Sequence, residues 1–224
     1  MRTSAVIVLF RGCNIMGYAT EQEAFWAGEF GEQYLVRNDG PELLASNVAF
    51  FSRALRMAGQ VESCIEFGSN IGMNLKALKV LYPHMERFAI EINKSASEKL
   101  KSHVGDENVY NGSIFDFDVT KQHQVALIRG VLIHINPDML QNVYEKLYQS
   151  SNKYILMIEY YNPTPVEIDY RGHEGKLFKR DFAGEMLDKY PDLKLVDYGF
   201  GYHRDESLGK MVGDGTWFLM EKCS

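Results

Sequence analysis

Short apolar runs alternate with longer helical stretches along most of this 224-residue chain. The runs that resemble strands are residues 63–67, 87–91, 108–110, 125–129 and 153–160. Helical patterns lie between them, over residues 73–81, 94–103 and 137–150. Because the runs are continuously apolar, we expect strands that are covered on both faces, as in a parallel sheet between layers of helices.

The last third of the sequence has a different composition and pattern. Residues 162–179 contain prolines, glycines and mixed charges, and they predict a long ordered loop. Residues 181–190 look helical, and residues 193–200 and 217–221 look like two strands joined by a glycine-rich connection. The sequence therefore predicts an α/β fold, a Rossmann-like three-layer sandwich with a seven-stranded, mostly parallel sheet and a C-terminal antiparallel hairpin.

Two helical patterns, over residues 21–37 and 41–58, precede the first predicted strand. We expect residues 1–60 to form an N-terminal extension and a helical cap or lid, and residues 61–224 to form the main domain. Gly28 and Gly31 weaken a plain helix, which favours a lid that closes over a ligand. A buried helix face is the alternative interpretation of the aromatic residues there. Residues 1–15 differ in texture, and one interpretation is an extension upstream of Met16.

Composition narrows the possible partners and surroundings. The formal net charge of −6 argues against a partner bound mainly through its phosphates, so we expect no nucleic acid. Cys13, Cys64 and Cys223 have no paired spacing, so neither a metal cluster nor a disulfide framework is expected, and Cys64 is predicted to be a buried free thiol. The apolar stretch 5–10 is too short to span a bilayer. We expect a cytoplasmic monomer or homodimer.

The first predicted strand runs into Glu66-Phe67-Gly68-Ser69-Asn70-Ile71-Gly72. Glycines at such a strand-to-helix turn let the backbone approach a ligand and expose amides at the helix N-terminus. The G-x-G-x-x-G of dinucleotide sites is absent, which disfavours a nicotinamide oxidoreductase. The spacing E-x-G-x-N-x-G instead resembles the methyltransferase loop E-x-G-x-G-x-G, with Asn70 as a tolerable replacement for glycine. A tight turn without a ligand is the simpler alternative.

Two more strand ends carry polar residues. Glu91 ends the second predicted strand, where a carboxylate can bind ribose hydroxyls, although it could equally be a solvated cap. Gly112, Ser113 and Ile114 follow the third strand, where methyltransferases contact adenine, and many of them carry Asp where Ser113 stands. These sites together predict S-adenosylmethionine as the cofactor. The predicted cofactor contacts are Trp26, Tyr34, Arg37, Glu66, Gly68, Ser69, Asn70, Gly72, Asn74, Glu91, Ile92, Gly112, Ser113, Ile114, Arg129, Gly130 and Val131.

Several blocks are more particular than the glycine loop. They are FWAGEFG (25–31), EFGSNIGMNL (66–75), GVLIHINP (130–137), EYYNPTP (159–165) and YRGHE (170–174). Through them the chain resembles the pseudaminic acid biosynthesis-associated methylases, a group within the class I S-adenosylmethionine-dependent methyltransferases. The resemblance spans nearly all of residues 20–222. It implies the seven-stranded methyltransferase fold, the same cofactor and, less directly, an acceptor from a sugar pathway.

Transfer of a methyl group to oxygen or nitrogen requires a positioned acceptor and a base. His134 follows the fourth predicted strand and is the best candidate for the base; alternatively it orients the turn before Asn136-Pro137. Glu159 and Tyr160, at the end of the fifth strand, complete the predicted catalytic set. We expect this strand end to line the substrate pocket, unless its tyrosines pack as an aromatic wall.

Basic residues are concentrated after the fifth strand. A guanidinium group in such a position suits a carboxylate or phosphate, although charges in loops are commonly only solvated. The predicted substrate contacts are Tyr161, Asn162, Arg171, His173, Lys179 and Arg180. The segment Arg129-Gly130-Val131-Leu132 lacks the Asp/Asn-Pro-Pro-aromatic motif of enzymes that methylate nucleic-acid bases.

The sequence thus predicts a methyltransferase acting on oxygen or nitrogen of a small anionic metabolite, and the resemblance favours a sugar-derived one, such as a nonulosonic acid or a nucleotide sugar. One alternative is a methyltransferase of an amino acid or another carboxylate metabolite. Another is a protein that keeps the fold and binds a ligand without turnover; the intact Glu66, Glu91 and His134 argue against it.

Overall fold

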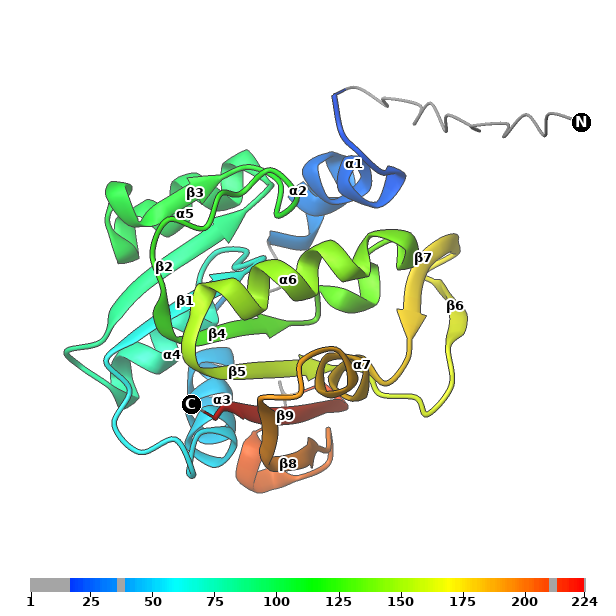
Figure 1. The fold of residues 1–224 in the computed structure, drawn as a ribbon. Coiled ribbons are helices and arrows are strands. Elements are labelled where there is room, and N and C mark those ends of the chain that lie inside the picture. Colours follow the sequence, from blue (N-terminus) through cyan, green and yellow to red (C-terminus); the bar gives the residue numbers. More distant parts are fainter. Residues whose placement is uncertain (1–16, 36–38, 210–212, 224) are drawn as a thin grey trace, which may run out of the picture.

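The computed structural model describes residues 17–35, 39–209 and 213–223. A seven-stranded sheet with the order β3-β2-β1-β4-β5-β9-β8 forms its centre (Figure 1). These strands are β1 (Ser63–Phe67), β2 (Glu86–Glu91), β3 (Val109–Asn111), β4 (His123–Arg129), β5 (Ser151–Glu159), β8 (Leu193–Gly201) and β9 (Gly215–Lys222). Strands β1 to β5 pair in parallel, and β9 pairs antiparallel with both β5 and β8. The predicted sandwich with a C-terminal antiparallel pair is confirmed.

Helices cover both faces of this sheet. On one face, α3 (Pro41–Ala54), α4 (Met73–Leu81) and α5 (Lys94–Val104) share a core with alternate residues of the strands, Cys64 among them. On the other face, α6 (Leu140–Ser150) and α7 (Phe182–Lys189) pack against the intervening residues, such as Ile65. Because side chains alternate along a strand, a run that is apolar at every position fits a sheet covered twice. Cys64 is a buried free thiol, as predicted.

The parallel register gathers the strand ends at one edge of the sheet. Phe67 of β1 is aligned with Ile90 of β2 and with Ile128 of β4, and Arg129 is aligned with Ile158 of β5. The loops that follow β1, β2, β4 and β5 therefore meet beyond the same edge. A ligand site in an open α/β sheet is expected there.

Residues 166–179 form a β-hairpin, so the prediction of a long loop over residues 162–179 was wrong. Strands β6 (Val166–Tyr170) and β7 (His173–Lys179) pair antiparallel outside the main sheet (Figure 1). Arg171 and Gly172 form the turn, with positive φ of 53° and 85°. Both prolines of the segment, Pro163 and Pro165, precede β6, where they interrupt no ladder. The local pattern is mixed because β6 is exposed along most of its length.

The first predicted helix is broken into α1 (Glu21–Ala27) and α2 (Glu29–Leu35) at Gly28, whose backbone is extended. These helices lie at the carboxyl edge of the sheet, next to the β6–β7 hairpin (Figure 1). Helix α3, by contrast, contributes Phe50, Phe51 and Ala54 to the main core. The division at residue 60 stays a prediction, and Arg37 and residues 1–16 lie outside the described residues.

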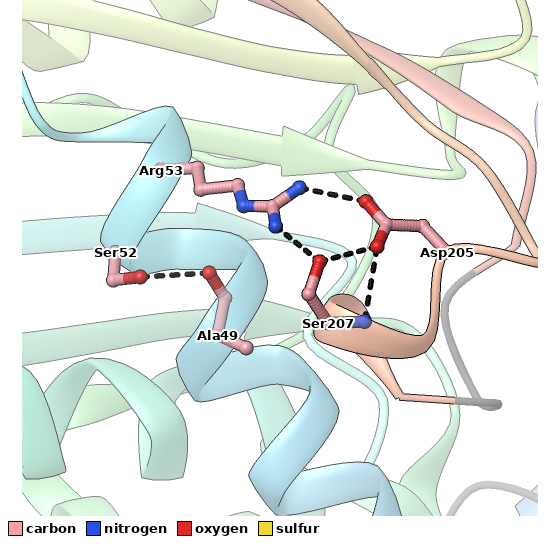
Figure 2. Close-up of polar contacts among 5 residues, drawn as sticks. All are labelled: Ala49, Ser52, Arg53, Asp205 and Ser207. Atoms are coloured by element: carbon pink, nitrogen blue, oxygen red, sulfur yellow. Dashed lines mark hydrogen bonds and ion pairs between the residues drawn. The ribbon is translucent and has the colours of Figure 1, made fainter.

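Polar contacts join α3 to the connection between β8 and β9 (Figure 2). The Arg53 guanidinium donates to Asp205 at 2.8 Å and also to the Ser207 hydroxyl. Asp205 in turn accepts from the Ser207 amide and caps the short 3-10 helix η4 (Glu206–Leu208). Leu208 is thereby buried in the core beneath α3. The loop between β8 and β9 is thus held against helix α3 by polar contacts.

The turn from β1 into α4 depends on Gly72, which has a positive φ of 82°. A Cβ atom there would lie 2.6 Å from Cδ2 of the buried Leu100. We expect Gly72→Ala to lower the free energy of unfolding by about 1–3 kcal/mol, through left-handed strain and overpacking. Urea unfolding measures this change.

Gly59→Ala is the matched control, since Gly59 also has a positive φ (68°) but no atom within 4 Å of the added Cβ. It should cost about 1 kcal/mol less than Gly72→Ala, because it carries the strain without the contact. If both variants lost the same free energy of unfolding, the Leu100 side chain would move away from the added Cβ atom without cost.

Candidate active site

A cavity of about 430 Å³ lies at the carboxyl edge of the sheet, under α1 and α2. Its size is within the range of pockets that hold small ligands. The loops after β1 to β5 and helices α1 to α4 supply its walls. It brings together predicted residues from each of these elements except α3, namely Trp26, Tyr34, Gly68, Ser69, Asn70, Asn74, Glu91, Ile92, Ile114, Arg129, Gly130, Val131, His134, Glu159 and Tyr160.

The glycine loop has a left-handed backbone at three positions. Gly68, Asn70 and Gly72 have φ of 73°, 50° and 82°. Asn70 therefore adopts the conformation for which asparagine replaces glycine most easily. A Cβ atom on Gly68 would lie 2.5 Å from Cγ2 of Val131, so glycine allows the loops after β1 and β4 to pack together.

A buried polar network lies at the end of β1. Asn74 donates to Oε1 of Glu66 at 2.6 Å, and Arg129 donates at 2.9 Å to the side-chain oxygens of both Asn74 and Asn47. Oε2 of Glu66 has no hydrogen-bond partner among the described residues. Burial raises the pKa of Glu66 to about 8, and its hydrogen bond with Asn74 opposes this shift. Glu66 is therefore largely protonated at pH 7 in the free protein.

Glu91 holds the loop after β1 against the end of β2. Its carboxylate accepts from the backbone amide of Asn70 at 2.6 Å and from that of Asn93 at 2.8 Å. Burial raises the pKa of Glu91, and these amides oppose the shift. The side chain is 7% exposed, at the cavity wall. Glu91 is therefore part of the site and is not a solvated cap.

Glu159 holds the loop after β4 in a similar way. Its Oε1 accepts from the amides of Val131 and Leu132, both at 3.0 Å, at the start of the 3-10 helix η2 (Leu132–His134). Burial raises the pKa of Glu159 to about 7 despite these amides. Glu159 thus fixes the short helix that carries His134.

His134 is buried at the cavity wall, against the rings of Trp26 and Tyr170 at centroid distances of 4.7 and 4.8 Å. Its Nδ1 lies 2.5 Å from the Lys176 carbonyl oxygen. Because a carbonyl oxygen can only accept, Nδ1 carries the proton and Nε2 keeps a free lone pair. Burial lowers the pKa of His134 to about 4, so the ring is neutral at pH 7.

Some predicted residues lie behind the cavity wall or away from it. Glu66, Gly72, Gly112 and Ser113 lie outside the cavity lining. Arg171 and His173 are exposed at the hairpin turn, and the Arg180 guanidinium is paired with Glu185. Asn162 donates to the Thr164 carbonyl oxygen. Tyr161 and Lys179 line a neighbouring groove, which adjoins the main cavity at Tyr160 and Gly213.

Sequence reasoning missed three residues that shape the site. Asn47 is a buried polar residue on the apolar face of α3, and that irregularity was a usable signal. Glu23 forms a capping box with Thr20, a pattern readable as T-x-x-E, but nothing local shows that it contacts Ser113. Tyr170 reaches the cavity because β6 pairs with β7, a hairpin that was not predicted.

The described residues contain neither a metal-binding cluster nor a membrane-spanning helix. In the part of the chain given above, no cluster of three or more His, Cys, Asp or Glu side chains could hold a metal ion. Across the same residues, no helix is long and apolar enough to cross a membrane.

Comparison with known proteins identifies the fold. No family model matches the sequence, and no curated protein matches it in sequence. The Burkholderia thailandensis 1,6-didemethyltoxoflavin-N1-methyltransferase, solved with 1,6-didemethyltoxoflavin and S-adenosylhomocysteine, matches with a TM-score of 0.65 at 11% identity, over 91% of this chain and 87% of its own.

Two other solved structures match in the same way. The magnesium protoporphyrin IX methyltransferase of Synechocystis PCC 6803, solved with bound S-adenosylmethionine, has a TM-score of 0.63 at 8% identity, over 91% of this chain and 98% of its own. An S-adenosylmethionine-dependent methyltransferase of Clostridium acetobutylicum ATCC 824 has a TM-score of 0.58 at 10% identity, over 87% of this chain and 98% of its own. The chain therefore has the fold of class I S-adenosylmethionine-dependent methyltransferases.

The raised pKa of Glu66 links stability to pH. Between its ordinary value of 4.5 and about 8, the folded protein keeps a proton that the unfolded chain has released, so stability falls as pH rises. Glu66→Gln cannot ionise and should reduce this decline between pH 5 and 8 by on the order of 1–3 kcal/mol. Urea unfolding at several pH values measures it.

A smaller decline should remain in the variant, because burial also raises the pKa of Glu91 and Glu159. Glu62→Gln, at an exposed position before β1, controls for the loss of one charge. If Glu66→Gln behaved like this control, Glu66 would be ionised in the folded protein at neutral pH.

Proposed function

We propose that this chain is an S-adenosylmethionine-dependent methyltransferase that acts on an oxygen or nitrogen atom of a small molecule. The observation that carries the proposal is the cavity at the carboxyl edge of the sheet, which Glu91 and Arg129 line at the ends of β2 and β4, with Glu66 of β1 buried behind the lining residue Asn74. Matched structures solved with S-adenosylmethionine or S-adenosylhomocysteine support it.

The residues present fit the parts of this cofactor. Glu66 has an unpartnered carboxylate oxygen among the described residues, and Arg129 belongs to the same network. These opposite charges suit the ammonium and carboxylate groups of an amino acid, and an ammonium group would favour the ionised form of Glu66. Glu91 suits ribose hydroxyls, and Ile92 and Ile114 offer apolar surfaces for a planar base. When bound, the cofactor supplies a methyl group on an electrophilic sulfonium.

In this proposal His134 is the base. Its Nε2 accepts the proton of the acceptor's hydroxyl or amino group, while Nδ1 stays bonded to the Lys176 carbonyl oxygen. Trp26 and Tyr170 pack against the ring and against each other, and they limit the access of water. Glu159 positions η2, and Tyr160 lines the acceptor end of the cavity.

We further propose that the acceptor is anionic and sugar-derived. Lys179 supports this, because its ammonium group lies 5.1 Å from the centroid of the Tyr160 ring, in the groove that adjoins the cavity. Its position suits a carboxylate or phosphate that projects from the acceptor. The pathway suggested by the pseudaminic-acid family rests on the sequence blocks alone. An amino acid or another carboxylate metabolite would use the same lysine.

Cofactor binding gives the first test. S-adenosylhomocysteine at 100 times its Kd should stabilise the protein by about 2.7 kcal/mol and raise its Tm, since it binds the folded state. NAD should leave the Tm unchanged, because the loop lacks the dinucleotide pattern. Stabilisation by NAD and not by S-adenosylhomocysteine would refute the proposed function.

The second test concerns His134. We expect His134→Ala to bind S-adenosylhomocysteine normally in calorimetry but to transfer methyl groups roughly 10²–10⁴-fold more slowly, through loss of the base. Transfer is measured once a screen of nonulosonic acids, nucleotide sugars and amino acids has found an acceptor. His84→Ala, in an exposed loop, is the matched control.

Full activity of His134→Ala would leave this histidine with the structural role of orienting its loop. If the wild-type protein bound the cofactor product but methylated none of these acceptor classes, the alternative of a binding protein without turnover would gain support.

A further inference from the structure

Glu23 is a buried carboxylate that α1 brings to the cavity. It is 7% exposed and belongs to the cavity lining. Its Oε2 accepts from the backbone amides of Ala19 at 2.8 Å and Thr20 at 3.3 Å, which completes the capping box of α1. Its Oε1 accepts from the Ser113 hydroxyl in the loop after β3. The contact joins two segments that are 90 residues apart in the sequence.

The charge of Glu23 is not balanced by a cation. Among residues 17–35, 39–209 and 213–223, no Lys or Arg side chain forms an ion pair with it. Its partners are two amides and one hydroxyl, all of them neutral. Buried charges in proteins are normally paired or fully hydrogen-bonded. Oε1 still has a lone pair to offer, so a ligand that donates an N–H group would suit this carboxylate.

The surroundings of Glu23 indicate which part of a ligand lies there. Ile92, Ile114 and Phe115 line the same cavity, in the loops after β2 and β3. Ser113 itself lies behind the lining, because its hydroxyl is turned to Glu23 and also accepts from the Phe115 amide at 2.9 Å. The carboxylate that faces the cavity next to this loop therefore comes from Glu23 of α1.

We propose that Glu23 accepts a hydrogen bond from the 6-amino group of the cofactor's adenine. The proposal rests on the proposed function, under which Glu66 and Arg129 hold the amino-acid end of the cofactor and Glu91 holds the ribose. The base then extends toward the loop after β3. The 6-amino group is the N–H donor on the adenine ring, and Glu23 is the acceptor that α1 supplies there.

This assignment couples the adenine end of the cofactor to the side of the site where the methyl acceptor would bind. Glu23 and Trp26 are three residues apart on α1, so they lie on the same face of the helix. Trp26 packs against His134 at a centroid distance of 4.7 Å. A hydrogen bond that holds Glu23 also holds Trp26 over the proposed base. Binding of the cofactor would then help to close the site before the acceptor reacts.

The test compares two ligands in calorimetry: S-adenosylhomocysteine and its purine analogue, in which hydrogen replaces the 6-amino group. The wild-type protein should bind S-adenosylhomocysteine about 10- to 100-fold more tightly, as expected for a hydrogen bond to a buried charge. In Glu23→Gln this ratio should fall to about one, because the glutamine oxygen stays on the capping-box amides and its NH2 group, which can only donate, faces the 6-amino group. Glutamine keeps the capping box, so α1 should persist.

Glu21→Gln is the control on the same helix, because Glu21 is exposed and pairs with Lys176 at 3.4 Å. It should keep the wild-type ratio. Equal binding of the two ligands by the wild-type protein would overturn the proposal even if Glu23→Gln failed to fold. An unchanged ratio in Glu23→Gln would overturn it as well. In both cases S-adenosylhomocysteine still binds, whereas failure of the proposed function means that it does not bind at all.

Discussion

Three buried glutamates at the ends of parallel strands organise the site. Glu66 accepts from Asn74 of the following helix, Glu91 accepts from the Asn70 amide of the loop after β1, and Glu159 accepts from two amides of the loop after β4. Glu91 and Glu159 thus hold the loops after β1 and β4, and Glu66 contacts the first turn of α4. Satisfied hydrogen bonds of this kind make a buried site more rigid.

Burial of these acids gives the cavity a distinctive electrostatic character. Burial raises the pKa of Glu66 to about 8 and that of Glu159 to about 7, so protons are retained near neutral pH. Arg129 is the counter-charge nearest to Glu66, and it is shared by Asn47 and Asn74. A ligand that carries an ammonium group or several donors would relieve the cost of burial. The site therefore favours a ligand with hydrogen-bond donors at this end.

The roof of the cavity depends on contacts between distant segments. Gln22 of α1 donates to the Gly175 carbonyl oxygen of β7, and Glu23 contacts Ser113 after β3. The hairpin also places Tyr170 and the Lys176 carbonyl oxygen against His134. The tautomer and orientation of His134 thus depend on a hairpin about 40 residues further along the chain.

The sequence by itself determined the fold class, a mostly parallel sheet with a C-terminal antiparallel hairpin. It also determined the glycine loop and the strand-end acids Glu66, Glu91 and Glu159. These features have local signals: continuous apolar strands, glycines at a strand-to-helix turn, and acids at a fixed offset from the strand. Strand limits predicted from the pattern agree with the structure to within two residues, as for β1, predicted at 63–67 and found at Ser63–Phe67. Local signals suffice here because both faces of each central strand are buried.

Only the tertiary structure decided how the remaining residues are used. The sequence suggests one basic cluster over residues 171–180. In the structure Arg171 is exposed at the hairpin turn, Arg180 pairs with Glu185 of α7, and Lys179 lines the groove beside the cavity. Glu23 and Asn47 reach the site through helix packing, which no local pattern encodes. Periodicity reveals which face of an element is buried. The partner that an individual polar side chain finds is set by segments far away in the sequence, and it emerges only when those segments pack.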